Sequence, residues 1–153
     1  MEKQSEFGVG PITIIPGYLA IIFLWLFADE ITILSNFALR IVISLALLII
    51  GIAFVYFSAS SLKLAQQSEN LNTNGIYSIS RNPMYCGHLC FIQTGLAVLS
   101  NNWYCFFSVL LSFSLFKLFI KKEEQYLNSV YAEEYVLYCK HVKQFLPLPR
   151  LRA

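Results

Sequence analysis

Four long hydrophobic runs, separated by polar segments, dominate the pattern of the chain. A membrane-spanning helix needs roughly 17–25 apolar residues, each of which adds about 1.5 Å of length. All four runs reach this length, so the pattern predicts an all-α, multi-span helical bundle in a membrane. The predicted spans are residues 12–28, 38–62, 84–100 and 103–120.

The connections between these runs predict how the spans are arranged. Only Asn101 and Asn102 separate the last two runs, which predicts a tight hairpin of antiparallel helices. A longer polar segment joins the second run to the third. The hairpin would bring this segment and the residues after the fourth run to the same side of the membrane, so we expect a functional site there.

Beyond Ile120 the pattern changes to that of an amphipathic helix. Apolar side chains recur every three or four residues, which places them on one face of a helix. They are Leu127, Tyr131, Tyr135, Tyr138 and Val142. Pro147 and Pro149 predict the end of this helix. We therefore expect a C-terminal amphipathic helix at the cytoplasmic membrane surface, and one domain over residues 1–153.

Composition and charge support a membrane location. Hydrophobic residues make up 57% of the chain and charged residues 13%, whereas about 25% of the residues of a soluble domain are charged. If the N-terminus is cytoplasmic, Arg40 is the only basic residue outside, as the positive-inside rule favours. The residues then inside are Lys3, Lys63, Arg81, Lys117, Lys121, Lys122, Lys140, Lys143, Arg150 and Arg152. Both termini are predicted to be cytoplasmic. No basic stripe is present, so a nucleic-acid partner is not expected.

The stretch NGIYSISRNPMYCG, residues 74–87, places polar and turn-forming residues directly before the third run. Proline suits the first turn of a helix, so Pro83 predicts a helix start with Asn82 as its N-cap. The free N–H groups of a helix start attract anions, and Arg81 adds a positive charge. The stretch is typical either of an anion-binding helix start or of an ordinary capped helix with an interfacial arginine.

Glu123 and Glu124 stand at the inner end of the fourth run. Adjacent carboxylates near a bilayer cost free energy unless they are solvated or paired. They would therefore either bind a cationic ligand or be neutralised by Lys121 and Lys122. Aromatic faces attract onium groups, and three tyrosines flank the region: Tyr77, Tyr85 and Tyr126. S-adenosylmethionine carries a carboxylate, an ammonium and a sulfonium, and it matches this set of groups.

The segment that contains Cys86, His88 and Cys90 has some of the composition of a metal site. Metal ligands must converge on one point, but on a helix His88 points away from the face that the two cysteines share. We therefore expect no metal site, and we expect the four cysteines of the chain to be reduced and structural.

The stretch 74–87, followed after about 35 residues by EEQYLNSVYAEEYVLYCKHVKQFLP, residues 123–147, resembles the isoprenylcysteine carboxyl methyltransferase family. The resemblance covers residues 71–147. That family is related to the phospholipid methyltransferases and consists of integral-membrane enzymes that use S-adenosylmethionine. The resemblance implies a cytoplasmic cofactor pocket formed by residues 69–87 and 121–147, closed by the loop and the C-terminal segment.

The resemblance also implies roles for individual residues. Tyr77 matches a tyrosine that helps to hold the cofactor, and Glu123 matches a glutamate that contacts it. The family's Arg-His-Pro-x-Tyr element falls on residues 81–85, and a polar run that lines the cofactor falls on residues 69–72. The implied cofactor-binding residues are Asn70, Leu71, Asn72, Tyr77, Asn82, Pro83, Tyr85 and Glu123. Arg81, Lys122 and Glu124 are candidates for positioning, and no residue is assigned to catalysis itself.

Three positions depart from the family pattern. Asn82 replaces the usual histidine, and an amide can form hydrogen bonds but carries no charge. Phe119 replaces an arginine that is implicated in substrate binding in the eukaryotic enzymes, which leaves Lys122 as the nearest basic residue. Ala132 replaces a glycine.

The predicted function is methyl transfer from S-adenosylmethionine to a carboxyl, amine or thiol group of a lipid-like or isoprenylated acceptor at the cytoplasmic membrane face. One alternative is a membrane reductase with a nicotinamide cofactor, although no glycine pattern for that cofactor is visible. Another alternative is a membrane binding module without catalysis. The predicted partners are a lipid or lipidated small molecule and the membrane itself.

Overall fold

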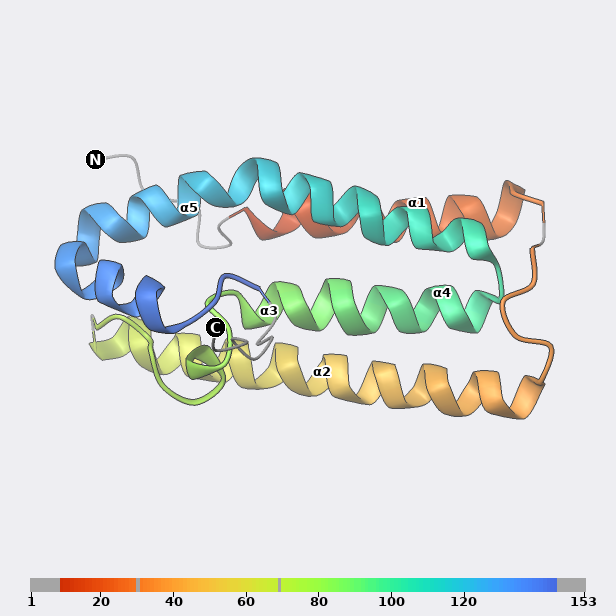
Figure 1. The fold of residues 1–153 in the computed structure, drawn as a ribbon, viewed down its shortest axis with the longest axis horizontal. Helices are drawn as coiled ribbons and strands as arrows, with labels where there is room; N and C mark the ends of the chain where they lie inside the picture. The colour runs from red at the N-terminus through yellow and green to blue at the C-terminus, as the bar shows by residue number, and fades with distance from the viewer. Residues whose placement is uncertain (1–8, 30, 69, 146–153) are drawn as a thin grey trace, which may run out of the picture.

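The computed structural model describes residues 9–29, 31–68 and 70–145, and in these residues it contains helices and loops but no β-strand (Figure 1). Three long helices, α1 (Gly10–Phe27), α2 (Phe37–Ser68) and α5 (Phe106–His141), run along the long axis of the molecule. The short helices α3 (Pro83–Cys86) and α4 (Thr94–Ser100) are joined by a π-helix, η2 (Gly87–Gln93). Two 3₁₀ turns complete the set, η1 (Gly75–Ser78) and η3 (Trp103–Cys105). The predicted all-α class is confirmed.

Three helical segments in the described part of the chain are long and apolar enough to cross a membrane, judged by length and composition. They are Gly10–Phe27, Phe37–Ala65 and Trp103–His141, and they contain most or all of three predicted spans. The predicted span 84–100 is not a fourth helix of this kind, because its backbone changes from α-helix to π-helix and back. Figure 1 nevertheless shows this segment lying lengthwise between α2 and α5.

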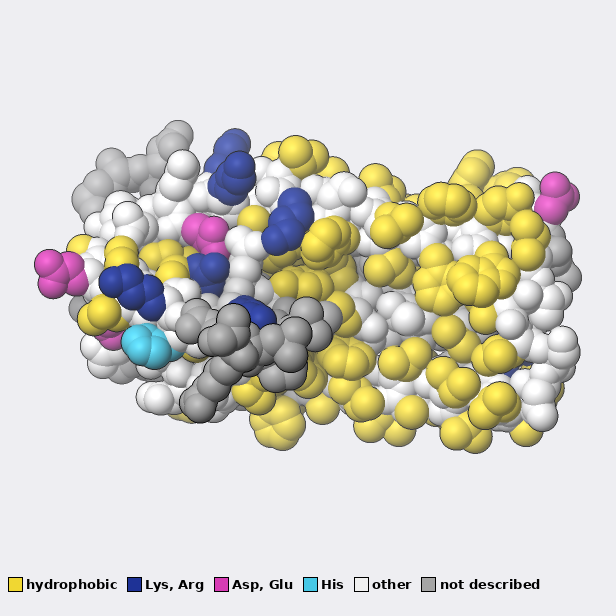
Figure 2. Space-filling view, in the orientation of Figure 1, with side chains coloured by type: hydrophobic (Ala, Val, Ile, Leu, Met, Phe, Trp, Pro, Cys, Tyr) yellow, Lys and Arg dark blue, Asp and Glu magenta, His cyan; other side chains and the backbone are white. Residues whose placement is uncertain are grey.

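The surface is divided along the length of the molecule (Figure 2). Hydrophobic side chains cover the part formed by the parallel helices, and most Lys, Arg, Asp and Glu side chains in view gather where α5 folds back. Many large apolar side chains on the long helices are exposed, Leu19, Phe27, Ile49 and Leu118 among them. Such a broad apolar surface is stable in hydrocarbon and would be unfavourable in water.

The predicted tight connection lies at Asn101 and Asn102. Asn101 has the left-handed conformation, with φ 56°, which asparagine tolerates better than most residues. Its Oδ1 accepts hydrogen bonds from the backbone N–H groups of Ile33 and Leu34, at 3.2 and 3.0 Å. The side chain of Asn102 accepts a bond from the N–H of Tyr104, at 3.0 Å. The two asparagines thus form the turn and attach it to the loop between α1 and α2.

The residues after Ile120 are helical as predicted, but no new helix begins there. Helix α5 continues through Ile120 without a break, and its two helical arms meet at a kink at Ala132, where φ is 41° and ψ is −116° and the chain reverses direction. The residues predicted to share one face lie on both sides of this break, so they cannot share one face of a straight helix. Two of them, Tyr135 and Tyr138, lie on the returning arm, and both are buried. Val142 lies beyond the helix end at His141. Pro147 and Pro149, which were expected to end the helix, lie outside the described residues, as do Glu69 and both termini.

Ala132 provides a test of this reversal. An L-residue at positive φ outside the favoured regions costs roughly 1–3 kcal/mol, whereas glycine adopts such a conformation freely. Ala132→Gly should therefore raise the free energy of unfolding by about 1 kcal/mol, and the melting temperature in detergent by a few degrees. The matched control, Ala59→Gly inside α2, should lower the free energy of unfolding by about 1 kcal/mol. Equal losses in both variants would show that the backbone at residue 132 is ordinary helix.

Candidate functional site

The candidate site lies at the charged end of the bundle, where three segments meet: the loop before α3, the two arms of α5, and residues 142–145, which we call the C-terminal strap. Two hydrogen bonds to the backbone hold these segments together. The N–H of Arg81 donates to the carbonyl of Lys143 at 2.9 Å. The hydroxyl of Tyr138 donates to the carbonyl of Tyr77 at 2.7 Å. The reversal of α5 is what brings the strap and Tyr138 to this loop.

Tyr85 and Glu123 form the inner part of the site. The Tyr85 hydroxyl donates to Oε2 of Glu123 at 3.3 Å. The Tyr85 ring is buried and packs on Phe116, with 4.9 Å between ring centroids. Glu123 is only partly exposed, and the backbone of Val9 gives it a second hydrogen bond. A carboxylate in such surroundings costs free energy unless donors surround it, so Glu123 is a strong acceptor for a cationic or hydroxyl-bearing ligand.

Tyr77 lies close enough to Glu123 to sense its charge. Burial, and to a lesser extent the negative charge of Glu123, raise the pKa of Tyr77 to about 12. The Tyr77 hydroxyl therefore keeps its proton at physiological pH and can donate a hydrogen bond. Tyr77, Tyr85 and Glu123, which were predicted to share one pocket, lie together in the structure.

Arg81 and Glu124 form an ion pair that joins the two sequence motifs. Their nearest atoms, Nη1 and Oε1, are 3.2 Å apart, and the side chains are 15% and 24% exposed. The Gln144 amide of the strap donates to Oε1 of Glu124 at 3.0 Å, and Lys117 donates to Oε1 of Gln144. Arg81 also contacts Sγ of Cys139. The positive charge of Arg81 is thus compensated inside the protein.

This pairing differs from both arrangements expected for the glutamates. Neutralisation by neighbouring lysines does not occur, because Lys121 and Lys122 are exposed and Glu124 pairs with Arg81 instead. Lys122, a predicted positioning residue, forms no hydrogen bond or ion pair with the site in the part of the chain that the structure describes. No local pattern in the sequence indicates that Arg81 and Glu124 are partners, because their contact depends on the tertiary fold.

Asn82 occupies the predicted N-cap position, and Pro83 begins α3 as expected, but the capping role predicted for the asparagine side chain is wrong. The Asn82 side chain makes no cap hydrogen bond, and its Nδ2 donates to the carbonyl of Gln144 at 2.8 Å. The Gln144 carbonyl of the strap accepts the hydrogen bond of the Asn82 amide, so the Asn82 side chain is oriented toward the strap and not toward the backbone of α3. Asn82 therefore ties the loop to the strap, in the position where the family pattern has a histidine.

The strap is attached by its aromatic residue as well. The Phe145 ring packs against Phe113 and Phe116, with centroids 5.5 and 5.2 Å apart. Its carbonyl accepts a hydrogen bond from Sγ of Cys86 at 3.1 Å. Neither Gln144 nor Phe145 was predicted as a site residue, and only the expected closure of the pocket by the C-terminal segment pointed to this region.

The predicted polar run lines a cavity of about 330 Å³. Asn70, Leu71 and Asn72 form one wall and the end of α2 forms another. The remaining lining residues are Ser61, Leu64, Ala65, Asn74 and Gly75. Nδ2 of Asn72 is enclosed and has no hydrogen-bond partner among the described residues. Tyr77, Tyr85 and Glu123 do not line this cavity, so the predicted site residues fall into two neighbouring groups.

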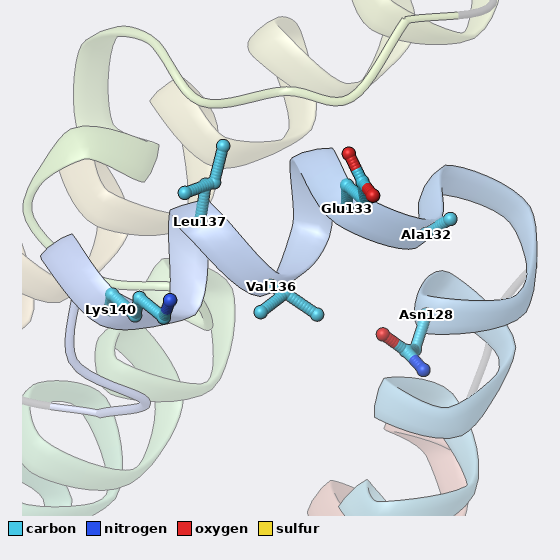
Figure 3. Close-up of a pocket in the computed structure, with 6 residues that line it drawn as sticks. All are labelled: Asn128, Ala132, Glu133, Val136, Leu137 and Lys140. Atoms are coloured by element: carbon cyan, nitrogen blue, oxygen red, sulfur yellow. The ribbon is translucent and has the colours of Figure 1, made fainter.

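A larger cavity, of about 490 Å³, lies where α5 reverses (Figure 3). Its lining residues are Asn128, Ala132, Glu133, Val136, Leu137 and Lys140, none of which was predicted as a site residue. Helical spacing places most of them away from the buried Tyr135 and Tyr138. Val136 and Leu137 are exposed. This cavity is therefore an open groove in the angle between the two arms of α5 (Figure 3), and neither Tyr85 nor Glu123 lines it.

The residues considered for a metal site have other partners. His88 forms a hydrogen bond with Tyr18, 2.9 Å between Nδ1 and Oη, and Cys86 donates to Phe145. No group of three or more His, Cys, Asp or Glu side chains within the described ranges is arranged to hold a metal ion.

The ion pair between Arg81 and Glu124 can be tested by a double-mutant cycle. Arg81→Gln and Glu124→Gln should each reduce stability, because each leaves a partly buried charge without its partner. The coupling energy of the pair should be about 1 kcal/mol or more, measured by unfolding in detergent. Lys122→Gln, at an exposed neighbouring position, should change stability by less than about 0.5 kcal/mol. A coupling energy of zero would contradict the contact.

Comparison with known proteins adds one match. The model of a family described as phospholipid methyltransferase matches residues 39–134, more than half of the chain. The matched range contains the loop, Arg81, Tyr85 and both glutamates, and it ends just after the reversal at Ala132. The strap lies beyond it. No curated protein and no solved structure matches the chain.

Proposed function

Because the chain belongs to the phospholipid methyltransferase family, we propose that it transfers a methyl group from S-adenosylmethionine to a lipid-like or isoprenylated acceptor at the cytoplasmic face of a membrane. One observation carries the proposal: the two sequence motifs meet in space. Tyr85 bonds to Glu123 at 3.3 Å and Arg81 pairs with Glu124 at 3.2 Å. Neither motif alone would form a pocket.

The chemistry of the available groups fits this cofactor. Glu123 can accept from an ammonium or a hydroxyl group, and the half-buried ring of Tyr77 can face a sulfonium. The enclosed Nδ2 of Asn72 is a hydrogen-bond donor without a partner in the described chain, and a buried donor of this kind is costly unless a ligand satisfies it. The adjoining cavity of about 330 Å³ is within the usual range for small-molecule sites.

The residues of the chain act by holding, orienting and excluding water. S-adenosylmethionine, when bound, supplies a methyl group on a positively charged sulfur. Phe116, Ile120 and Phe145 surround Tyr85 with apolar contacts, which keeps water from the inner side of the site. The strap, attached through Asn82 and Gln144, closes the site from the solvent side. Fixing two reactants in one orientation is a large contribution that such a site can make.

The acceptor reaches this site from the bilayer. The exposed apolar surfaces of α1, α2 and α5 extend from the hydrocarbon region to the charged end, so a lipid can stay in the bilayer while its head group enters the site. In this proposal segment 83–100 serves as a fourth crossing, so both termini lie on the same side of the membrane as the site, and the distribution of Lys and Arg favours the cytoplasm for that side. A carboxylate acceptor could react directly, whereas an amine or thiol would first lose a proton.

The topology can be tested by cysteine labelling in intact cells, in a variant without the four native cysteines. A cysteine at Asn101 should react with a reagent that does not cross the membrane, whereas a cysteine at Lys121 should react only after the membrane is made permeable. The basis is the distribution of Lys and Arg, which strongly favours one orientation. The reverse pattern would contradict both the topology and the cytoplasmic site.

Cofactor binding can be measured by calorimetry with S-adenosylhomocysteine. Glu123→Gln and Tyr85→Phe should each weaken binding by about tenfold or more, because each removes a hydrogen bond at a charged group. Glu133→Gln, in the separate groove, is the matched control and should bind normally. Thermal unfolding of each variant separates lost binding from lost folding.

Two results would contradict the proposal. One is a folded wild-type protein that binds neither S-adenosylhomocysteine nor S-adenosylmethionine, above all if NADPH binds instead. The other is unchanged binding in both folded variants, which would place the cofactor elsewhere.

A further inference from the structure

A hydrogen-bonded pair, Tyr18 and His88, lies next to the candidate site and is not used in the function proposed above. Oη of Tyr18, on α1, is 2.9 Å from Nδ1 of His88, on η2. The two rings meet edge to face, with centroids 6.0 Å apart and an interplanar angle of 86°. This double contact fixes the orientation of the imidazole and connects α1 with the segment that starts at Tyr85.

The position of His88 relates it to the site. His88 follows Tyr85 by three residues, which corresponds to about 4.5 Å along a helix axis. Tyr85 bonds to Glu123 at the charged end, and the chain runs from Tyr85 toward the apolar part of the bundle. His88 is therefore one turn deeper than the proposed cofactor contacts. The head group of an acceptor anchored in the bilayer would approach from that side.

The imidazole has a free nitrogen. Nδ1 is used by Tyr18, whereas Nε2 has no hydrogen-bond partner in the described part of the chain. His88 is half-buried, and Nε2 is not among the enclosed polar atoms that lack a partner. A ligand can therefore reach Nε2 without displacing an existing bond.

The backbone around His88 is also unusual. Residues 87–93 form a π-helix, a rare conformation that is found frequently at functional sites. The hydroxyl of Thr94 donates to the carbonyl of Leu89 at 3.1 Å, which compensates in part for the altered backbone pattern. A polar pair inside an apolar bundle costs stability, and so does a distorted helix. Apolar side chains in place of Tyr18 and His88 would avoid the first cost, and a regular α-helix would avoid the second.

We propose that His88, oriented by Tyr18, accepts the proton of the methyl acceptor, so that the acceptor is an amine or a thiol. This inference rests on the proposed function. Breakage of the acceptor's N–H or S–H bond moves its proton to Nε2 and leaves the electron pair on the acceptor. That pair forms a bond to the methyl carbon, the carbon–sulfur bond of the sulfonium breaks, and its electrons stay on sulfur as a neutral thioether. The imidazolium returns its proton to water.

A carboxylate acceptor would not need the Tyr18–His88 pair for the reaction. A carboxylate is already deprotonated at neutral pH, and it needs no base to attack a sulfonium methyl. An ammonium group or a thiol is protonated at neutral pH and cannot attack until a base takes its proton. A fixed imidazole with a free nitrogen, placed on the membrane side of the cofactor contacts, supplies that base.

The test uses the full-length protein in detergent micelles, S-adenosylmethionine with a labelled methyl group, and three acceptors. They are a lipid with an ethanolamine head group, a long-chain alkanethiol, and a farnesylated cysteine with a free carboxylate. His88→Asn keeps a group that can bond to Tyr18 but removes the base. It should lower kcat for the amine or thiol acceptor by about 100-fold or more. Binding of S-adenosylhomocysteine should be unchanged.

The dependence on pH separates a proton acceptor from a structural residue. The wild-type rate should rise with pH as the imidazole loses its proton, and this rise should be absent in His88→Asn. Added imidazole should restore part of the variant's activity. Tyr18 is the titratable side chain in contact with the His88 ring, and Cys90 lies two residues further along the same segment. The α2 residues packed on the neighbouring Gly87 are Gly51, Phe54 and Val55, which do not titrate.

Two further variants serve as controls. His141→Asn changes the other histidine of the chain, which is exposed on α5, and should leave the rate and its pH profile unchanged. Tyr18→Phe keeps the ring contact and removes the hydroxyl, so it should fold, lower kcat less than His88→Asn does, and shift the pH profile. It provides a second test if His88→Asn does not fold.

The outcomes distinguish this inference from the function on which it rests. A wild-type protein that binds no S-adenosylhomocysteine and methylates none of the three acceptors would overturn the proposed function. An active wild type with a His88→Asn variant of near-normal rate and pH profile would overturn the inference alone. Methylation of the carboxylate acceptor only would also overturn it. If His88→Asn loses activity, is not rescued by added imidazole and binds S-adenosylhomocysteine more weakly, His88 has a structural role. This result would also overturn the inference.

Discussion

Glu123 and Glu124 lie where the apolar part of α5 ends, and the rest of the site depends on how these two adjacent carboxylates are paired. Glu123 is bonded by Tyr85 and Glu124 by Arg81, so each glutamate takes its partner from the segment around the start of α3. An unpaired charge at this depth would cost several kcal/mol. The two pairs therefore hold α5 against the start of α3. They also fix the relative position of two proposed cofactor contacts, Tyr85 on α3 and Glu123 on α5.

The reversal of α5 completes the arrangement at the price of a strained residue. Because the chain turns back at Ala132, Tyr138 reaches the carbonyl of Tyr77 and the strap reaches Arg81 and Asn82. The strap then forms a second layer over the ion pair through Gln144. A positive φ at an alanine persists only where the surrounding contacts outweigh its cost, and these bonds are such contacts. Glycine, which the resembling family has at this position, would adopt the same turn without strain.

Local features of the sequence were enough to predict the helical class, the turn at Asn101 and Asn102, and the proximity of Tyr77, Tyr85 and Glu123. Hydrophobic length, proline placement and a short connection each act over a few residues, so they can be read from the chain directly. The π-helix at 87–93 and the fold-back at Ala132 could not be predicted, because a hydrophobic pattern does not distinguish α- from π-helix or locate a break inside a periodic run. The partners of Arg81, Asn82 and Glu124 depend on the strap, and nothing in the residues near Gln144 indicates its role.

The central claim is that the loop before α3, the glutamates of α5 and the strap form one ligand site. Hydrogen exchange measured by mass spectrometry, with and without S-adenosylhomocysteine, tests it directly. Ligand should slow exchange in peptides covering residues 70–82 and 133–145 together, while the turn at Asn101 and Asn102 stays unchanged. Slower exchange in only one of the two segments, or in neither at saturating ligand, would contradict the account.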